Sequence, residues 1–557
     1  MHRLKSGNEV FVITERAFAG RLRWMLCFLS AAVISALGQK ADMPANPGGS
    51  AAVLQRDGTV VSHHVVMLSD GKRVSYTARA GFLPLRRDDA QSNGEVLGEM
   101  FFVAYTVDRA TGQRRPITFV WGGGPGGPST LSSVGPKRLQ PAKNDATASP
   151  RYEVADNPDT WLEMTDIVLI DEIGTGYSRV TKPEYAPLFF NEKGDAEAFT
   201  EFIRIYMRRY DTTDAPIFLL GESYGSIRGA LVSAIANRCG IPVRGVIVSA
   251  NAILLDLENT DLYPPLLLPS FTATALYHKK LPAELMQDRD KTLREAEAWA
   301  QRDYAAALAR GSSMSAEERK LVVAQFARYT GLKPDVIERN NLRVTAEVFG
   351  NELLRDEGKI IGHYDSRIAE TAPPRAFDPT TDPSLMARAD AMPRLMERLY
   401  FSHELGVNAN LLGSKADSLY LGPFGGAWPP PPPGNVYPRT AVNTKEWMAM
   451  RWDANNGFSS YGIPILKMFV DAIENNKKLN VLIAGGRYDL VTPYMAATYL
   501  KNRLTPEASQ RFTVVTYDRG HMGRSAEYRQ EARMFYEQVL AKPLPPERET
   551  PWTRENQ

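Results

Sequence analysis

The sequence predicts an α/β fold in which helices cover a mostly parallel central sheet, and three observations lead to it. Short, almost wholly apolar runs recur along the chain, as in strands that are buried on both faces. Segments with helical periodicity lie between several of these runs, which is the order that parallel strands require. The earliest runs are instead separated only by turn residues, so we expect the leading edge of the sheet to be antiparallel.

The first expected elements are three strands, TVVSHHVVML (59–68), RVSYTARAGFL (73–83) and EMFFVAYTVD (99–108). The parallel part of the sheet is expected from six later runs. These are PITFVW (116–121), DIVLID (166–171), IFLLG (217–221), GVIVSA (245–250), NVLIAGG (480–486) and RFTVVTY (511–517). Helices are expected at 197–210 and directly after IFLLG, where small residues follow.

A long region lacks such strands. Residues 254–463 contain helical segments instead, notably 283–311 and 315–331. Ser315, with Glu318 three residues later, matches the capping box that opens many helices. We interpret the region as a mainly helical cap inserted into the α/β domain, and an independent helical domain is the alternative.

This interpretation leaves 59–253 and 464–557 as the two parts of one α/β domain. Residues 39–58 are rich in Ala, Gly and Pro and form a flexible lead-in. Within the cap, five prolines at 429–433 follow Trp428. We expect them to form a rigid spacer, with a ligand for a proline-binding partner as the alternative.

Residues 1–38 have the pattern of a secretory signal peptide. Basic residues precede the apolar run WMLCFLSAAVISALG (24–38), which ends in small residues. The run is shorter than the roughly 20 residues that a membrane span needs. A signal peptide predicts a secreted or periplasmic protein; an uncleaved signal anchor and a buried helix are the alternatives.

Composition excludes several classes of function. The formal net charge of +2 over 557 residues gives no basic footprint for nucleic acid. Cys27 lies in the expected signal peptide, which leaves Cys239 alone. Neither an intramolecular disulfide nor a zinc site built from several cysteines is then possible. We expect no cofactor and no metal ion, and the sequence does not indicate the oligomeric state.

The pentapeptide GESYG at 221–225 follows an expected strand and opens an expected helix. In that setting Gly-x-Ser-x-Gly matches a nucleophile elbow, a sharp turn that presents a serine at the edge of the sheet. The bare pattern arises by chance in roughly one chain in five or six of this length, at average glycine usage. The strand and helix around it therefore decide the interpretation, and they make Ser223 the candidate nucleophile.

A nucleophilic serine needs a base, and the base needs a group that orients it. Among the seven histidines, only His521 follows an expected strand near the C-terminus. Asp489 follows the preceding apolar strand. The order Ser223, Asp489, His521 is the one that this architecture uses, and the interval after Asp489 leaves room for one helix and one strand. Taken singly, His521 is also compatible with a surface loop, and Asp489 with a turn or helix cap.

Glycines dominate residues 122–127, directly after another expected strand. Their backbone can approach a bound carbonyl closely and offer N–H groups to a developing oxyanion. A phosphate-binding loop is excluded because no Lys-Ser/Thr pair follows the glycines. A tight structural turn is the alternative.

With these blocks in view, the chain resembles the serine carboxypeptidases, a family of the α/β-hydrolase superfamily. The blocks occur in the family's order: Gly-Gly-Pro-Gly (123–126), DEIGTGYSR (171–179), GESYG, the Asp489 loop and GHM (520–522). The resemblance implies an α/β-hydrolase fold with a cap. It also implies a serine-type carboxypeptidase that releases C-terminal residues from peptides through an acyl-enzyme.

The resemblance implies a role for each matching residue. Ser223 would be the nucleophile, His521 the base and Asp489 its partner. The backbone N–H groups of Gly124 and Tyr224 would form the oxyanion hole.

Glu222, with Gly122 and Gly123 nearby, would bind the C-terminal carboxylate of the substrate. Two carboxylates share a hydrogen bond only when one holds a proton, so activity on free C-termini should favour acidic pH. The family usually carries Asn where this chain has Gly122, so one recognition group is missing. Many eukaryotic members have Cys where this chain has Gly127, which points to a disulfide-free, bacterial version.

Two other functions stay open. A prolyl-aminopeptidase-like peptidase or an esterase would use the same fold, although prolyl aminopeptidases typically have His at the position of Gly122. A non-catalytic binding protein is the third hypothesis, and the intact Ser223, Asp489 and His521 argue against it.

Overall fold

The computed structural model describes nine stretches of the chain: residues 52–87, 93–108, 114–129, 134–141, 152–378, 381–386, 396–413, 464–521 and 526–541. They fall within one compact unit that begins at Gly48. The expected signal peptide, residues 39–51 of the lead-in and the proline run lie outside the described residues.

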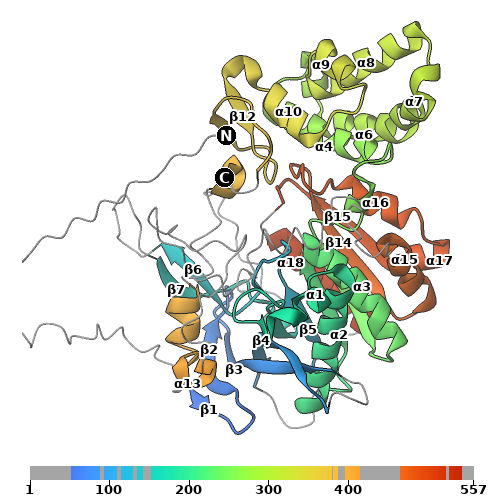
Figure 1. Cartoon of the computed structure of the whole chain (residues 1–557). Helices are drawn as coiled ribbons and strands as arrows, with labels where there is room; N and C mark the ends of the chain where they lie inside the picture. Colours follow the sequence, from blue (N-terminus) through green and yellow to red (C-terminus); the bar gives the residue numbers. More distant parts are fainter. Residues whose placement is uncertain are drawn as a thin grey trace, which may run out of the picture. The chain divides into compact units, whose positions relative to one another are not determined.

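An 11-stranded sheet forms the centre of this unit (Figure 1). Its first four strands pair antiparallel in sequence order, which confirms the expected antiparallel edge. They are β1 (Val53–Leu54), β2 (Val60–Met67), β3 (Arg73–Arg86) and β4 (Val96–Val107). Strand β4 also pairs antiparallel with β8 (Asp166–Ile170) and with the short β9 (Arg179–Val180).

The other strands are parallel and follow the order β8, β5, β10, β11, β14, β15. Their bounds are β5 (Ile117–Trp121), β10 (Ile217–Glu222), β11 (Val243–Ser249), β14 (Asn480–Gly486) and β15 (Phe512–Tyr517). Every residue of β5 and β8 is buried, which explains why these runs are apolar without alternation. Since β14 and β15 are neighbours, the loops that follow them meet at one edge of the sheet.

Helices cover both faces of the sheet. On one face lie α2 (Glu192–Arg209), α3 (Tyr224–Arg238) and α15 (Ile465–Asn475), and on the other lies α18 (Ala526–Leu540). Successive residues of β10 divide between the two cores: Leu219 packs in the first, and Phe218 and Leu220 pack in the second. This layered, mostly parallel arrangement with antiparallel leading strands is the α/β-hydrolase fold predicted from the sequence.

Shorter elements join these layers. Strands β6 (Lys137–Pro141) and β7 (Tyr152–Asp156) pair antiparallel as a separate sheet. Helix α1 (Ala186–Phe189) precedes α2, and helices α16 (Met495–Lys501) and α17 (Pro506–Ser509) connect β14 to β15. None of the helices in the described ranges combines the length and the apolar character that crossing a membrane requires.

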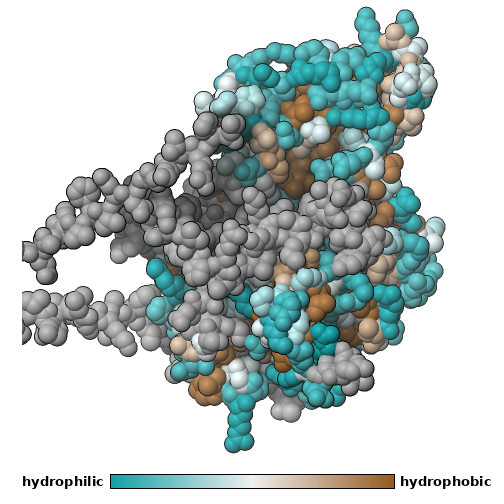
Figure 2. Space-filling view, in the orientation of Figure 1, coloured by the Kyte–Doolittle hydropathy of each residue, from teal (hydrophilic) through white to brown (hydrophobic). Residues whose placement is uncertain are grey.

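The described residues between 254 and 463 form mainly helices, as the sequence predicts. They are α4 (Pro264–Tyr277), α5 (Ala283–Met286), α6 (Arg289–Trp299), α7 (Ala305–Arg310), α8 (Ala316–Thr330), α9 (Pro334–Arg339), α10 (Ala346–Glu352), α11 (Pro383–Met386) and α13 (Ala409–Leu412). The capping box of Ser315 and Glu318 is present. A small antiparallel pair, β12 (Lys359–Ile361) and β13 (Ala369–Thr371), is an addition that the sequence did not predict. Figure 2 shows mainly hydrophilic residues over these helices, with apolar residues gathered beside α4 and α10.

Residues 396–413 pack differently from the helices before them. Tyr400, Phe401, Leu405 and Val407 lie in the core on the sheet face that α18 covers. The ring of Phe401 lies 6.2 Å from that of Phe101 in β4, and Figure 1 shows α13 beside the first strands. This stretch, which the sequence analysis placed in the cap, thus contributes to the core of the α/β domain.

Candidate active site

Ser223 forms the turn between β10 and α3. Its φ of 56° and ψ of −125° lie in a region that non-glycine residues rarely adopt, and such strain is typical of functional sites. A side chain on Gly221 or Gly225 would collide with the main chain and with Trp121, so both positions require glycine. The strand, the strained serine and the helix together give the geometry of the predicted elbow.

Asp489 follows β14, His521 follows β15, and the structure brings the two side chains together. His521 Nδ1 lies 2.8 Å from Asp489 Oδ2, and both residues are buried. Asp489 Oδ1 accepts the backbone N–H groups of Val491 at 2.8 Å and of Thr492 at 2.9 Å, and the Thr492 hydroxyl donates to Oδ2. With Nδ1–H directed to the carboxylate, Nε2 of His521 is the nitrogen that can act as a base.

The electrostatics of His521 suit that role. Burial lowers the pKa of the imidazole, but the charge and hydrogen bond of Asp489, together with the charge of Glu222, outweigh burial and raise it. The site therefore stabilises the imidazolium that forms when His521 takes a proton. The raised pKa also means that His521 becomes protonated, and so unable to accept a further proton, at a higher pH than an ordinary histidine.

Ser223 lies at a cavity of about 710 Å³ that Gly124 and Tyr224 also line. A Cβ on Gly123 would lie 2.7 Å from Ser223 Cβ and 3.4 Å from its Oγ, so the glycine loop runs directly against the serine. The structure thus brings both predicted oxyanion donors to the predicted nucleophile.

Glu222 is the last residue of β10. Its Oε2 accepts the hydroxyl of Ser249 at 3.3 Å, and its charge acts on His521. The described residues that line the cavity do not include Glu222, Gly122 or Gly123. The predicted carboxylate-binding group therefore lies beside the serine, outside the main cavity.

A buried ionic network supports the glycine loop, and sequence reasoning missed it. Arg228 of α3 pairs with Glu172, and its Nε donates to Asp195 Oδ2 at 2.8 Å. Arg228 Nη1 donates to the carbonyl of Gly122 at 3.1 Å, and Glu172 Oε1 accepts the N–H of Gly126. The network ties both ends of the loop to α2 and α3. One signal could have revealed it: Glu172 comes just after a strand that is apolar except for Asp166, within the DEIGTGYSR block.

We expect Arg228→Met to lower the free energy of unfolding by about 3–5 kcal/mol, because it leaves two carboxylates buried without their cation. Chemical denaturation measures the loss. Arg204→Met is the matched control, since Arg204 of α2 pairs with Glu201 on an exposed surface, where a pair contributes about 0–1 kcal/mol. A loss for Arg228→Met no larger than for the control would contradict the supporting role of the network.

A segment of the insertion, residues 363–366, contacts the loops of both Asp489 and His521. The carbonyl of His363 accepts the N–H of Leu490 at 2.9 Å, and Ser366 N–H donates to the carbonyl of Tyr488 at 2.9 Å. His521 N–H donates to the carbonyl of Tyr364 at 2.5 Å, and the two rings meet edge to face at 5.0 Å. The insertion therefore helps to hold the loops of Asp489 and His521 in place.

This contact explains why the first residue of the GHM block, Gly520, is a glycine. A Cβ there would collide with the carbonyl of Tyr364 and with Asp365. The third residue of the block, Met522, lies outside the described residues.

Comparison with known proteins agrees with these features. The family model of serine carboxypeptidases matches residues 71–338, a stretch that contains the glycine loop and Ser223. The pheromone-processing carboxypeptidase KEX1 of Ogataea parapolymorpha is 26% identical over 183 residues, which cover 30% of this chain and 27% of that protein. The chain thus spans about a quarter of the length of the curated relative that it matches.

Two solved structures are also similar. A crystal structure of Kex1(delta)p, a prohormone-processing carboxypeptidase from Saccharomyces cerevisiae, has a TM-score of 0.48 and 14% identity, covering 83% of this chain and 91% of that one. A proline iminopeptidase from Mycobacterium smegmatis has a TM-score of 0.31 and 14% identity, covering 83% and 99%. Residues 71–338, just under half of the chain, thus match the serine carboxypeptidase family.

Proposed function

We propose that the protein is a serine-type carboxypeptidase that releases C-terminal residues from peptides through an acyl-enzyme. One observation carries the proposal: the strained Ser223 and the buried His521–Asp489 pair follow three parallel strands in the family's order. The match of residues 71–338 to the serine carboxypeptidase family supports it independently.

In the proposed reaction, Ser223 Oγ attacks the carbonyl carbon of the last peptide bond while its proton passes to His521 Nε2. Asp489 stabilises the imidazolium, and the N–H groups of Gly124 and Tyr224 hold the oxyanion. His521 then gives the proton to the departing amine as the C–N bond breaks. Water, activated by His521, attacks the acyl-enzyme and releases the shortened peptide with Ser223 regenerated.

The choice of C-terminal bonds is assigned to Glu222. Its position at the end of β10 places a carboxyl group beside the attacking serine, where a C-terminal residue would lie. A substrate carboxylate binds there only when the pair shares a proton. With Gly122 in place of the family's Asn, Glu222 binds the carboxylate with one side chain fewer.

We expect N-blocked peptides with a free C-terminus to be cleaved faster than their C-terminal amides. The advantage should grow as the pH falls, because two facing carboxyl groups must share a proton. Glu222→Gln should flatten the pH dependence of KM for the free acids, because an amide donates a hydrogen bond at every pH. Steady-state kinetics on matched acid and amide pairs measures both effects.

The same peptides separate the competing functions. Faster cleavage of the amides, or release of N-terminal residues alone from unblocked peptides, would refute the carboxypeptidase proposal and favour a prolyl-aminopeptidase-like enzyme or an esterase. An unchanged pH profile of KM in Glu222→Gln would refute the role of Glu222 alone.

We also propose that the protein acts outside the cytoplasm, either secreted or in the periplasm. The signal-peptide pattern of residues 1–38 supports this location. An N-terminal sequence of the exported protein that begins near residue 39 would be the expected result, and a retained apolar run would contradict cleavage.

A further inference from the structure

The cavity at Ser223 has the size and position of a substrate pocket. Its volume of about 710 Å³ lies within the roughly 300–1,000 Å³ that small ligands occupy. Because Glu222 and Gly122 lie outside it, a peptide whose C-terminal carboxylate binds at Glu222 directs its other end into the cavity. The cavity therefore takes the acyl part of the substrate, on the N-terminal side of the scissile bond.

The charges of the cavity do not balance. Four charged side chains line it: Glu258, Asp261, Arg343 and Glu347. Arg343 binds Asp261 through two contacts of 2.6 Å, so these two charges cancel. His363 adds no compensating charge near neutral pH, since burial lowers its pKa more than Asp382 and Glu347 raise it. Two carboxylates remain without a cation from the described lining.

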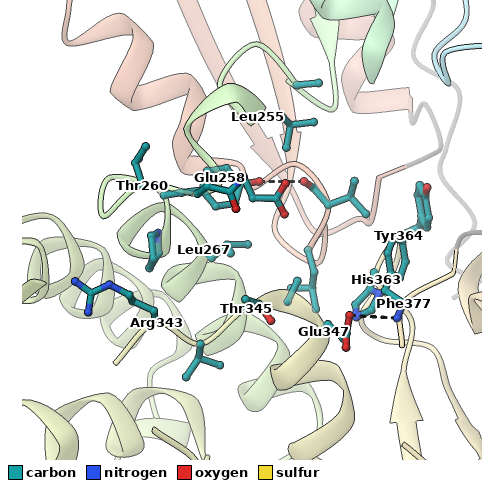
Figure 3. A pocket seen from close by; sticks show the side chains of 18 of the residues that line it. Leu255, Glu258, Thr260, Leu267, Arg343, Thr345, Glu347, His363, Tyr364 and Phe377 are labelled. Carbon is teal, nitrogen blue, oxygen red and sulfur yellow. Dashed lines mark hydrogen bonds between the residues drawn. The ribbon is translucent and has the colours of Figure 1, made fainter. Parts of the chain in front are cut away.

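These two carboxylates differ in their partners. Glu347 accepts the backbone N–H of Phe377 at 3.3 Å. Within the described part of the chain, the side chain of Glu258 has no hydrogen bond or ion pair. Figure 3 shows Glu258 at the wall that includes Leu255 and Leu267, with Glu347 beside Phe377. Glu258 is thus the cavity carboxylate that lacks a partner.

Glu258 also lies on the side of the cavity that faces the loop of Asp489. Burial, followed by the charges of Glu258 and Asp489, raises the pKa of Tyr263, whose hydroxyl donates to the carbonyl of Val491 at 3.2 Å. Both carboxylates therefore act on the same phenol. Partial burial raises the pKa of Glu258 itself, although the residue remains exposed to solvent at the cavity.

We propose that Glu258 selects substrates whose acyl part carries a cationic group, and this inference rests on the proposed function. The cation would be the side chain of Lys or Arg next to the scissile bond, or the N-terminal ammonium of a short peptide. Its charge would give Glu258 a partner that the described residues do not supply, and the apolar residues of the wall would contact its methylene groups. Glu347, already bound to Phe377, would add to the negative potential.

Two substrate pairs separate the two sources of the cation. N-acetylated peptides with Lys or norleucine before the C-terminal residue test the side chain, and acetylated or free tripeptides of neutral residues test the N-terminal ammonium. We expect wild-type kcat/KM to favour the cationic member of at least one pair by about tenfold, as one charge-assisted contact provides. No preference in either pair would overturn the proposal.

The variant Glu258→Gln should lose most of this preference while keeping a side chain of the same size. Glu295→Gln is the matched control, because it removes the same charge from an exposed residue on α6, away from the cavity lining. The control should retain the wild-type preference. A preference that survives in Glu258→Gln would show that another group recognises the cation.

Chromogenic esters keep the result independent of the proposed function. The p-nitrophenyl esters of acetyl-lysine and acetyl-norleucine have no C-terminal carboxylate, so they report on the acyl side alone. A lysine preference that Glu258→Gln removes, with no release of C-terminal residues from any peptide, would refute the carboxypeptidase proposal and support the cation site. Release of C-terminal residues without a preference for the cationic member of either peptide pair would do the reverse.

Discussion

Ser223→Ala should lower kcat by about a million-fold, the scale seen when a serine hydrolase loses its nucleophile. The variant keeps the Cβ, so the strained turn between β10 and α3 and the packing around it stay as they are. Only the oxygen that attacks the substrate is lost. Release of the C-terminal residue from an N-blocked peptide measures the effect, and the unfolding midpoint shows whether the fold is intact.

Ser233→Ala is the matched control for this experiment. Ser233 is also buried in α3, where its hydroxyl donates to the carbonyl of Ala230. Its loss should leave kcat close to that of the wild type. If Ser223→Ala also retained activity of that order, Ser223 would not be the nucleophile and the proposed mechanism would be wrong.

The elements that the sequence predicts well are those with a strong local signal. The apolar run before Ser223 forms β10, the small residues after it form α3, and the meander before residue 109 is antiparallel. Period, length and turn residues determine such elements within a short window. The order of Ser223, Asp489 and His521 along the chain then predicted which loops meet, because the C-terminal ends of parallel strands share one edge.

The rest of the site depends on contacts between distant segments. Arg228 of α3 pairs with Glu172, which follows β8, and with Asp195 of α2. The carbonyl of Tyr364, in the insertion, accepts the backbone N–H of His521. No periodicity within the sequence encodes these pairs. Residues 396–413 are a similar case. Their apolar side chains are compatible with a cap or with a sheet face, and only the folded sheet shows which of the two they pack against.

Removing the charge of Asp489 should affect both the orientation of His521 and the pKa of His521. In Asp489→Asn the buried side chain keeps its shape but no longer favours the tautomer of His521 that has its proton on Nδ1, so kcat should fall by about 10⁴-fold. Asp518→Asn is the control: Asp518 lies three residues before His521 but pairs with Arg289 and Arg487 near the surface. The control should lose far less activity.

The residual activity of Asp489→Asn should also show a changed pH profile. In the wild type, Asp489 raises the pKa of His521 against burial, which lowers it. Without that charge, burial prevails over the remaining effect of Glu222, and the pKa of His521 falls. The neutral imidazole then persists to lower pH, so the acid limb of kcat/KM should move toward lower pH. An amide substrate is used because it has no C-terminal carboxylate that must share a proton. If the acid limb stays in place, a group other than His521 controls the pH dependence. A variant that is only destabilised would lose activity without any shift of the acid limb.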